Sequence, residues 1–324
     1  MKTSCLCYSV NAMNVRVIIT ILILSAALYL GLLYALYARV LGCTAKQKKL
    51  PIRLPKAEGY IPYHEQMKAL VAEMEQQPFE TVETRSRDGL LLKARYLHVR
   101  DGAPVMIQAH GYRSWAIRDL CGANKLAREN GLNSLLIDMR AHGRSEGRTL
   151  TFGIKERYDI LDWTAYLQTR FGEQTPIFFS GVSMGAATVL MTADLPLPDA
   201  VKGILADSPY SSPEAIVRSV IRKHNLPDRV FFPLVNQSAR LFGHVDLRSM
   251  DVRQTVKKSP VPILLIHGTG DAFVPYEMSL EIRNANPEKI RLLLVQGAPH
   301  GIGYLVDQNA YEQAALTFVK ENLA

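Results

Sequence analysis

The stretch Pro176–Ala187, PIFFSGVSMGAA, decides the fold of the chain. Its apolar run Ile177–Phe179 predicts a buried strand, and the small residues after Ser183 predict a helix that begins at once. Gly181 and Gly185 flank the serine in the pattern G-x-S-x-G. A strand that turns sharply into a helix strains the turn and leaves no room for side chains two positions to either side. The stretch therefore predicts a nucleophilic serine whose hydroxyl is exposed above a sheet.

Apolar runs alternate with helical stretches on both sides of this motif. Strands are predicted at 104–109, 133–138, 176–180, 201–206, 262–267 and 290–295, after a hairpin formed by 80–84 and 90–98. Helices are predicted near 117–130, 153–171, 184–194, 276–286 and 307–322. This alternation is typical of a doubly wound, mostly parallel sheet that is covered on both faces. We therefore expect an α/β fold with its functional residues at the carboxyl ends of the strands.

Two further residues supply what a serine nucleophile needs. A serine hydroxyl is weak at neutral pH and requires a general base that is itself oriented by an acid. His300 follows the last predicted strand and Asp271 follows the strand before it, so both are expected at the sheet edge that carries Ser183. The order serine, aspartate, histidine fits this type of sheet. Asp207 is the alternative acid, although the adjoining Ser208-Pro209 favours a turn or helix cap there.

Two backbone amides are predicted to form an oxyanion hole. The N–H of Met184 lies at the start of the helix after the serine, and the N–H of Tyr112 follows the strand 104–109, where Gly111 permits a tight turn. His110 is expected to have a structural role. The polar run 138–145, DMRAHGRS, is expected to form a rigid turn held by hydrogen bonds.

Residues 17–38, VIITILILSAALYLGLLYALYA, contain no charged side chain. At ~1.5 Å per residue they span ~33 Å, about the thickness of a bilayer core. Tyr34 and Tyr37 lie near one end, where interfacial tyrosines are common. We predict a transmembrane helix. The alternatives are a lipoprotein or cleaved signal, which Arg39 and the length of the run oppose, and a buried core helix.

The segments around the apolar run complete the predicted organisation. Residues 1–16 form a short tail, residues 39–78 a basic linker with an amphipathic helix, and residues 79–324 the globular domain. Two basic residues precede the run, and more follow it: Arg39, Lys46, Lys48, Lys49, Arg53 and Lys56. Because positive residues favour the cytoplasmic side, we expect a cytoplasmic domain. The alternative is an enzyme that sends its large domain outside.

About 50 residues separate the strand 201–206 from the strand 262–267, which exceeds the usual αβ connection. This interval, residues 208–259, is rich in arginine and aromatic residues. We expect it to form a lid over the strand ends. The alternative is an ordinary pair of packing helices.

Composition excludes several classes of function. The net charge is +8, but no helix-turn-helix, zinc-finger spacing or RNA-binding pattern accompanies it, so we expect no nucleic-acid partner. The eight histidines lack metal-binding spacing, and we expect no metal or cofactor. Of the four cysteines, only Cys121 lies within 79–324, so the fold does not depend on a disulfide.

Five motifs in order make residues 79–324 resemble the α/β-hydrolase superfamily, in its serine esterase, lipase and aminopeptidase-like branch. They are HGY at 110–112, DMRAHGRS at 138–145, GVSMG at 181–185, HGTGDAFVP at 267–275 and APHG at 298–301. The membrane-tethered form with a basic flank is similar to a set of bacterial hydrolases.

This resemblance implies a triad of Ser183, His300 and Asp271. It implies an enzyme that cleaves a carboxylic ester or thioester of a small or lipid-like acyl substrate through an acyl-enzyme, without a cofactor. The alternatives are an aminopeptidase or amidase with the same triad, and a non-catalytic protein that uses the fold for binding.

Overall fold

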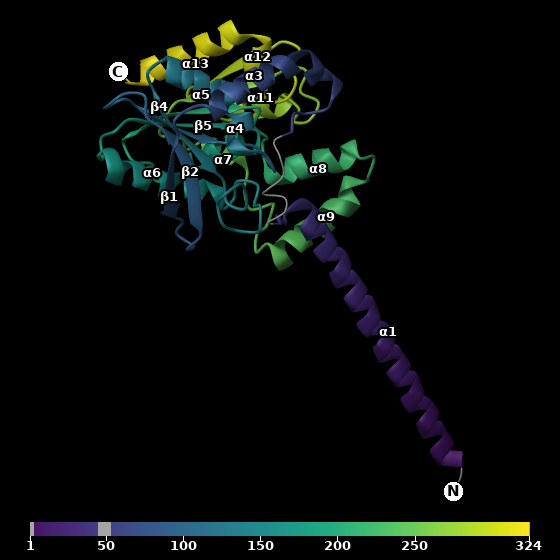
Figure 1. Cartoon of the computed structure of the whole chain (residues 1–324). Coiled ribbons are helices and arrows are strands. Elements are labelled where there is room, and N and C mark those ends of the chain that lie inside the picture. Colours follow the sequence, from purple (N-terminus) through teal and green to yellow (C-terminus); the bar gives the residue numbers. More distant parts are fainter. Residues whose placement is uncertain (1–2, 45–52, 324) are drawn as a thin grey trace.

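The computed structural model describes residues 3–44 and 53–323, which form one long helix and an α/β domain (Figure 1). The helices are α1 (Thr3–Val40), the 3-10 helix η1 (Glu58–Tyr63), α3 (His64–Glu75), α4 (Ala116–Asp119), α5 (Cys121–Glu129), α6 (Glu156–Phe171), α7 (Met184–Leu190), α8 (Pro213–Lys223), α9 (Asp228–Phe242), α10 (Val252–Val256), α11 (Glu277–Ala285), α12 (Gly303–Val306) and α13 (Gln308–Leu323). The strands are β1 (Glu80–Arg85), β2 (Leu91–Leu97), β3 (Val105–Ala109), β4 (Asn133–Asp138), β5 (Ile177–Val182), β6 (Val201–Asp207), β7 (Ile263–Gly268) and β8 (Ile290–Val295).

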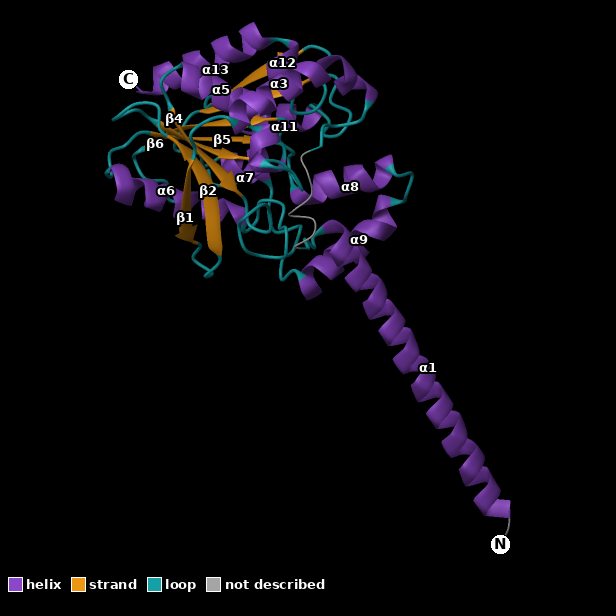
Figure 2. Ribbon diagram, in the orientation of Figure 1, coloured by secondary structure: helices purple, strands orange, loops and turns teal. Residues whose placement is uncertain are grey.

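The strands form a single sheet in the order β1-β2-β4-β3-β5-β6-β7-β8. β1 and β2 pair antiparallel, β2 is also antiparallel to β4, and the strands from β4 to β8 in this order run parallel. The mostly parallel α/β sheet predicted from the sequence is confirmed. Figure 2 shows the sheet enclosed between helices.

Strand β5 shows why the central strands are continuous apolar runs in the sequence. Ile177 and Phe179 belong to the core cluster beneath α6, α7 and α11, whereas Phe178 belongs to the cluster beneath α5, α12 and α13. Successive side chains of a strand point to opposite faces, so a strand covered on both faces must be apolar throughout. This double burial fixes the sheet and holds the carboxyl ends of its strands at one edge.

Helix α1 projects away from the domain (Figure 1), and its segment Asn14–Val40 is long and apolar enough to cross a membrane. Leu28, for example, is 78% exposed. The helix is longer than the predicted 17–38, because the expected tail contains neither glycine nor proline and residues 3–16 continue the same helix. The linker lysines Lys46, Lys48 and Lys49 lie outside the described residues.

The carboxyl-terminal part of α1 packs against the domain. Tyr29 Oη donates a hydrogen bond to Gln237 of α9 at 2.6 Å, and Tyr37 Oη lies 2.6 Å from Thr149 Oγ1. Leu33 is fully buried. After the helix, Gly42 forms an antiparallel bridge with Thr149. The end of α1 is therefore part of the folded domain, which the sequence does not predict.

The interval 208–259 contains three helices with two different positions. α8 and α9 pack on each other, and α9 packs along α1. α10 instead packs against α7 and α11, within the layers of the core. In the linker, Met67 and Met74 of α3 are buried, as the amphipathic pattern predicts.

Candidate active site

Ser183 lies between β5 and α7 in a backbone conformation that is rare for a residue with a side chain, with φ 57° and ψ −116°. The two flanking glycines make this turn possible. A Cβ on Gly185 would overlap the carbonyl group of Ala109 in β3, and a Cβ on Gly181 would overlap the backbone of Gly185. The spacing of the G-x-S-x-G pattern thus follows from the close approach of three backbone segments.

His300 and Asp271 meet in the loops after β8 and β7. Nδ1 of His300 lies 2.6 Å from Oδ2 of Asp271, which leaves Nε2 of the histidine as the nitrogen available to a serine hydroxyl. Oδ1 of the aspartate accepts hydrogen bonds from the N–H groups of Phe273 and Val274, both at 2.8 Å. His267 lies 3.1 Å from the same Oδ2. The carboxylate is therefore fixed in position by three neighbours besides His300.

The electrostatics of this pair suit a general base and its orienting acid. Burial opposes ionisation of Asp271, but hydrogen bonds from His267 and His300 outweigh it and hold the pKa of this carboxyl well below its usual range. The Asp271 side chain is fully buried, and His300 is 14% exposed. A buried carboxylate that stays ionised can orient the imidazole and stabilise the imidazolium formed during proton transfer.

Asp207, the alternative acid, has other partners. Its Oδ2 accepts a hydrogen bond from Tyr311 Oη at 3.2 Å, and its Oδ1 accepts one from Ser208 Oγ at 2.8 Å. Its backbone carbonyl accepts from the N–H of Ser183 at 2.8 Å. Burial raises the pKa of Asp207. Among the described residues no hydrogen bond joins it to His300, so the geometry favours Asp271 as the acid.

The two predicted oxyanion donors lie beside the serine. Met184 is the first residue of α7, so its N–H has no partner within the helix. Gly111 approaches the nucleophile so closely that a Cβ there would lie 3.3 Å from Cβ of Ser183. The amides on either side of Tyr112 are both anchored: Gly111 N–H donates to Asp119 Oδ2 at 2.9 Å, and Arg113 N–H donates to a histidine of the turn after β4 at 3.0 Å.

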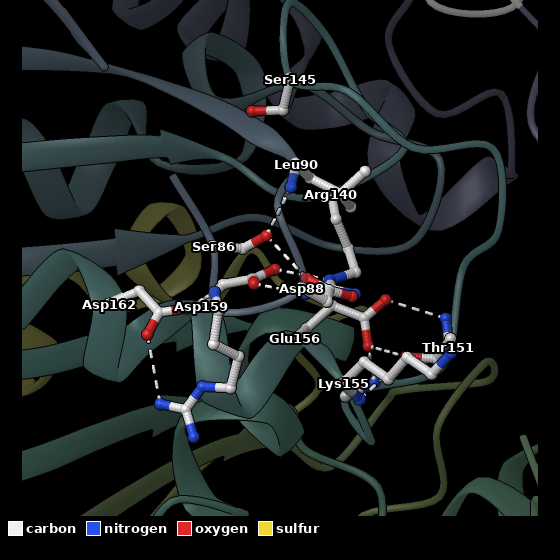
Figure 3. A network of polar contacts seen from close by, with 12 residues as sticks. Ser86, Asp88, Leu90, Arg140, Ser145, Thr151, Lys155, Glu156, Asp159 and Asp162 are labelled. Carbon is white, nitrogen blue, oxygen red and sulfur yellow. Dashed lines mark hydrogen bonds and ion pairs between the residues drawn. The ribbon is translucent and has the colours of Figure 1, made fainter. Parts of the chain in front are cut away.

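The polar turn after β4 supports this loop. The histidine that holds Arg113 is His142, whose Nδ1 lies 2.9 Å from the carbonyl oxygen of Arg140. The Arg140 guanidinium binds Asp159 at 2.7 Å and Asp88 at 2.8 Å, as Figure 3 shows. These contacts agree with the structural role expected for the turn. His110 agrees as well, since its ring is fully buried and accepts from the N–H of Met139 at 3.2 Å.

Sequence reasoning missed three residues of the site. Asp119 lies in the short helix α4, where no motif marks it. Tyr60 belongs to the predicted linker, yet its Oη donates to the carbonyl oxygen of His300 at 2.9 Å. The ring of Phe273 contacts the His300 imidazole edge-on, with the ring centres 5.2 Å apart. Of these three residues, only Phe273 had a signal in the sequence. It belongs to the GDAFVP motif, and this motif and the APHG motif that contains His300 follow neighbouring strands.

The proposed nucleophile and base share one cavity of about 210 Å³, which we call the catalytic cavity. Its lining includes Ser183, His300, Asp207, Tyr60 and Arg118. Of the predicted site residues, Asp271 and His300 lie in the loops after β7 and β8, and Ser183 and Met184 lie where β5 turns into α7. Tyr112 lies in the loop after β3 and lines the catalytic cavity together with Ser183 and His300. No group of three or more potential metal ligands is found among the described residues.

A family model described as the alpha/beta hydrolase fold matches residues 104–254. The chain has the alpha/beta hydrolase fold. The family model and the fold together support a hydrolase. Among solved structures, the chain is similar to the esterase Pf2001 of Pyrococcus furiosus, with a TM-score of 0.64 and 23% identity over 85% of this chain and 97% of the other.

Curated relatives add two sequence comparisons. The chain is 23% identical to the uncharacterized protein YqkD of Bacillus subtilis (strain 168) over 71% of its own length and 76% of the relative. It is 30% identical to the thiohydrolase aneE of Aspergillus aculeatus over 37% of its own length and 38% of the relative. The structural similarity establishes the fold and does not identify the reaction.

Asp119 provides a test of how the oxyanion loop is positioned. Asp119→Ala removes the acceptor of the Gly111 N–H, so we expect kcat for a p-nitrophenyl ester to fall about 10–100-fold with little change in KM. Removal of an oxyanion donor lowers kcat more, by about 10²–10³-fold. Asp119→Ala only displaces the Tyr112 N–H, which can still form part of its hydrogen bond to the oxyanion. Asp119→Asn retains an acceptor oxygen and should recover much of the loss.

The matched control is Asp101→Ala, since Asp101 has a fully exposed side chain in the turn before β3. It should leave kcat unchanged. A purely structural role for Asp119 would instead lower the melting temperature while kcat of the folded fraction stayed normal.

Proposed function

We propose that the protein is a serine hydrolase that cleaves a carboxylic ester or thioester through an acyl-enzyme. The observation that carries the proposal is the 2.6 Å contact between His300 Nδ1 and Asp271, with His300 and Ser183 lining the same cavity. Each of the three residues follows a different parallel strand, where ligands of such sheets bind.

In the proposed reaction, Nε2 of His300 takes the proton from Ser183 Oγ as the oxygen attacks the carbonyl carbon. The N–H groups of Met184 and Tyr112 bind the oxyanion of the tetrahedral intermediate. His300 then gives the proton to the leaving alcohol or thiol, and the acyl group stays on the serine. Water attacks this ester with His300 again as base, and the acid product leaves while Ser183 regains its proton.

The surroundings of the serine favour an ester or thioester over an amide with a free amine. An aminopeptidase needs a carboxylate that is free to bind the substrate amine. Among the described residues, two carboxylates line the catalytic cavity, and both are engaged: Asp119 with Gly111 and Arg118, and Asp207 with Ser208 and Tyr311. The names of the esterase Pf2001 and of the thiohydrolase aneE point to the same two substrate classes.

Labelling of the full-length protein with a fluorophosphonate tests the proposal. We expect one covalent adduct, located at Ser183 by tandem mass spectrometry. Acyl p-nitrophenyl esters and acyl thioesters should be hydrolysed much faster than aminoacyl p-nitroanilides. Preference for the anilides would establish the amidase alternative, and a folded protein without any adduct would establish the non-catalytic one.

We further propose that α1 crosses the membrane once and that the α8–α9 part of residues 208–259 acts as a lid. The exposed apolar side chains of α1 support the first proposal, because a solvated helix of this kind would be costly. The position of α8 and α9 near Ser183 supports the second, since both helices line a cavity that reaches the serine.

The orientation of the span can be tested with protease. Because the basic residues follow α1, we expect protease added to intact cells to spare residues 53–323 and to digest them after the membrane is permeabilised. A cytoplasmic marker protein serves as the control for intact membranes. Digestion of the domain in intact cells would show that it lies outside and would leave the single span in place.

A further inference from the structure

A second cavity, of about 310 Å³, also reaches Ser183. We call it the apolar cavity, because hydrophobic side chains dominate its lining. Three helices contribute many of them: Leu36 and Val40 of α1, Val217 and Ile221 of α8, and Phe231 and Val235 of α9. No acidic residue lines it within the described part of the chain. Such a cavity next to a nucleophile suits the hydrocarbon chain of an acyl group.

The wall that α1 contributes is held in place by several hydrogen bonds. Tyr112 Oη donates to the carbonyl oxygen of Val40 at 2.7 Å. The Arg113 guanidinium donates to the carbonyl oxygens of Gly42 at 2.7 Å and Ala38 at 3.3 Å, which lie at the carboxyl end of α1, where a cation is favourable. The backbone bridge between Gly42 and Thr149 adds a further link.

These links join α1 to the loop that carries the proposed oxyanion donor, since Tyr112 contributes both the donor N–H and the hydroxyl that binds Val40. The Tyr112 ring also stacks on Phe152, another residue of the apolar cavity, with ring centres 5.4 Å apart. The last turn of α1 therefore lies at a fixed position relative to the serine and to the oxyanion loop.

We propose that the apolar cavity is the acyl pocket and that the last turn of α1 is one of its walls, so that this helix selects the acyl chain in addition to holding the enzyme at a membrane. The inference rests on the proposed serine hydrolase function. It assigns Leu36 and Val40 as specificity-determining residues. A side chain that fills the pocket from α1 should exclude long chains, while short acyl groups still reach Ser183.

The test compares butyryl and dodecanoyl p-nitrophenyl esters on full-length protein in bilayer nanodiscs. Each buried methylene contributes roughly a fourfold gain in kcat/KM, so the loss of a few contacts is measurable. Leu36→Trp should lower the dodecanoyl-to-butyryl ratio of kcat/KM by about tenfold or more. The matched control is Leu28→Trp, in the exposed part of the same helix, which should leave the ratio unchanged.

Val217→Trp fills the same cavity from α8 and should shift the ratio in the same direction. The rate of labelling by a small fluorophosphonate reports an intact site in every variant. If the Leu36→Trp variant is not labelled by the fluorophosphonate, the Leu36→Ala variant tests the proposal in its place. This smaller side chain should shift the preferred acyl chain to a greater length.

The outcomes separate the two proposals. Absence of labelling and turnover in the unmodified protein would refute the serine hydrolase itself. If the enzyme is active but Leu36 variants behave like Leu28→Trp, the wall assignment is wrong, even if Val217→Trp shifts the ratio. If neither Leu36 nor Val217 variants shift it, the apolar cavity is not the acyl pocket.

Discussion

Ser183→Ala is expected to abolish fluorophosphonate labelling and to lower ester turnover by about 10³-fold or more. The reason is that the acyl-enzyme can no longer form, while His300 and Asp271 stay in place. The loss is measured as kcat/KM on a p-nitrophenyl ester with protein of verified thermal stability. Because alanine adopts the same turn with the same flanking glycines, we expect a melting temperature close to that of the unmodified protein.

Ser180→Ala is the matched control for this change. Ser180 lies in β5, three residues before the proposed nucleophile, and is 8% exposed. It should retain labelling and turnover. Full turnover in Ser183→Ala would remove the basis of the proposed mechanism.

Asp271→Asn is expected to lower kcat by roughly 10³–10⁴-fold. The asparagine amide can present an N–H to Nδ1 of His300, which then carries its proton on Nε2 and cannot act as the base. Asp207→Asn is the matched control, since Asp207 is a buried aspartate at the end of the neighbouring strand with Tyr311 and Ser208 as its partners. If Asp207→Asn were the more damaging substitution, the acid would be misassigned.

The Asp271→Asn variant also tests how the stability of the protein depends on pH. The pKa of Asp271 is depressed in the folded state, so its contribution is present above the unfolded pKa of about 3.9 and is lost as pH falls through the folded value. The stability difference between the unmodified protein and Asp271→Asn, measured by urea unfolding, should therefore be greatest at neutral pH. It should shrink at about pH 3 and below.

Much of the fold and of the site could be predicted because the signals are local. The apolar run before Ser183 is buried on both faces, so it identifies β5 without knowledge of its neighbours. Gly181 and Gly185 lie where neighbouring backbone segments come so close that any side chain would overlap them. His300 and Asp271 follow strands of a parallel sheet, so their position along the chain was sufficient to place them at one edge.

The remaining parts depend on contacts that leave no local pattern. Tyr29 and Gln237 are 208 positions apart, and neither belongs to a motif. Tyr60 binds the backbone of His300 from a segment whose prolines indicate a spacer. In α1, lipid and a protein neighbour favour the same apolar residues, so composition cannot show that the last turns of the helix pack on α9.

The attachment of α1 has a consequence for how the enzyme meets its substrates. A domain on a flexible stalk can tumble and sample molecules far from the bilayer. Here Arg113, Tyr112 and Thr149 contact the end of α1 directly, so no flexible joint separates this helix from the proposed catalytic residues. With α1 spanning a membrane as proposed, a domain held in this way would keep a constant height and tilt over the bilayer. Its encounters with substrate would then be a two-dimensional search, in which the surface density of substrate, rather than its bulk concentration, sets the rate.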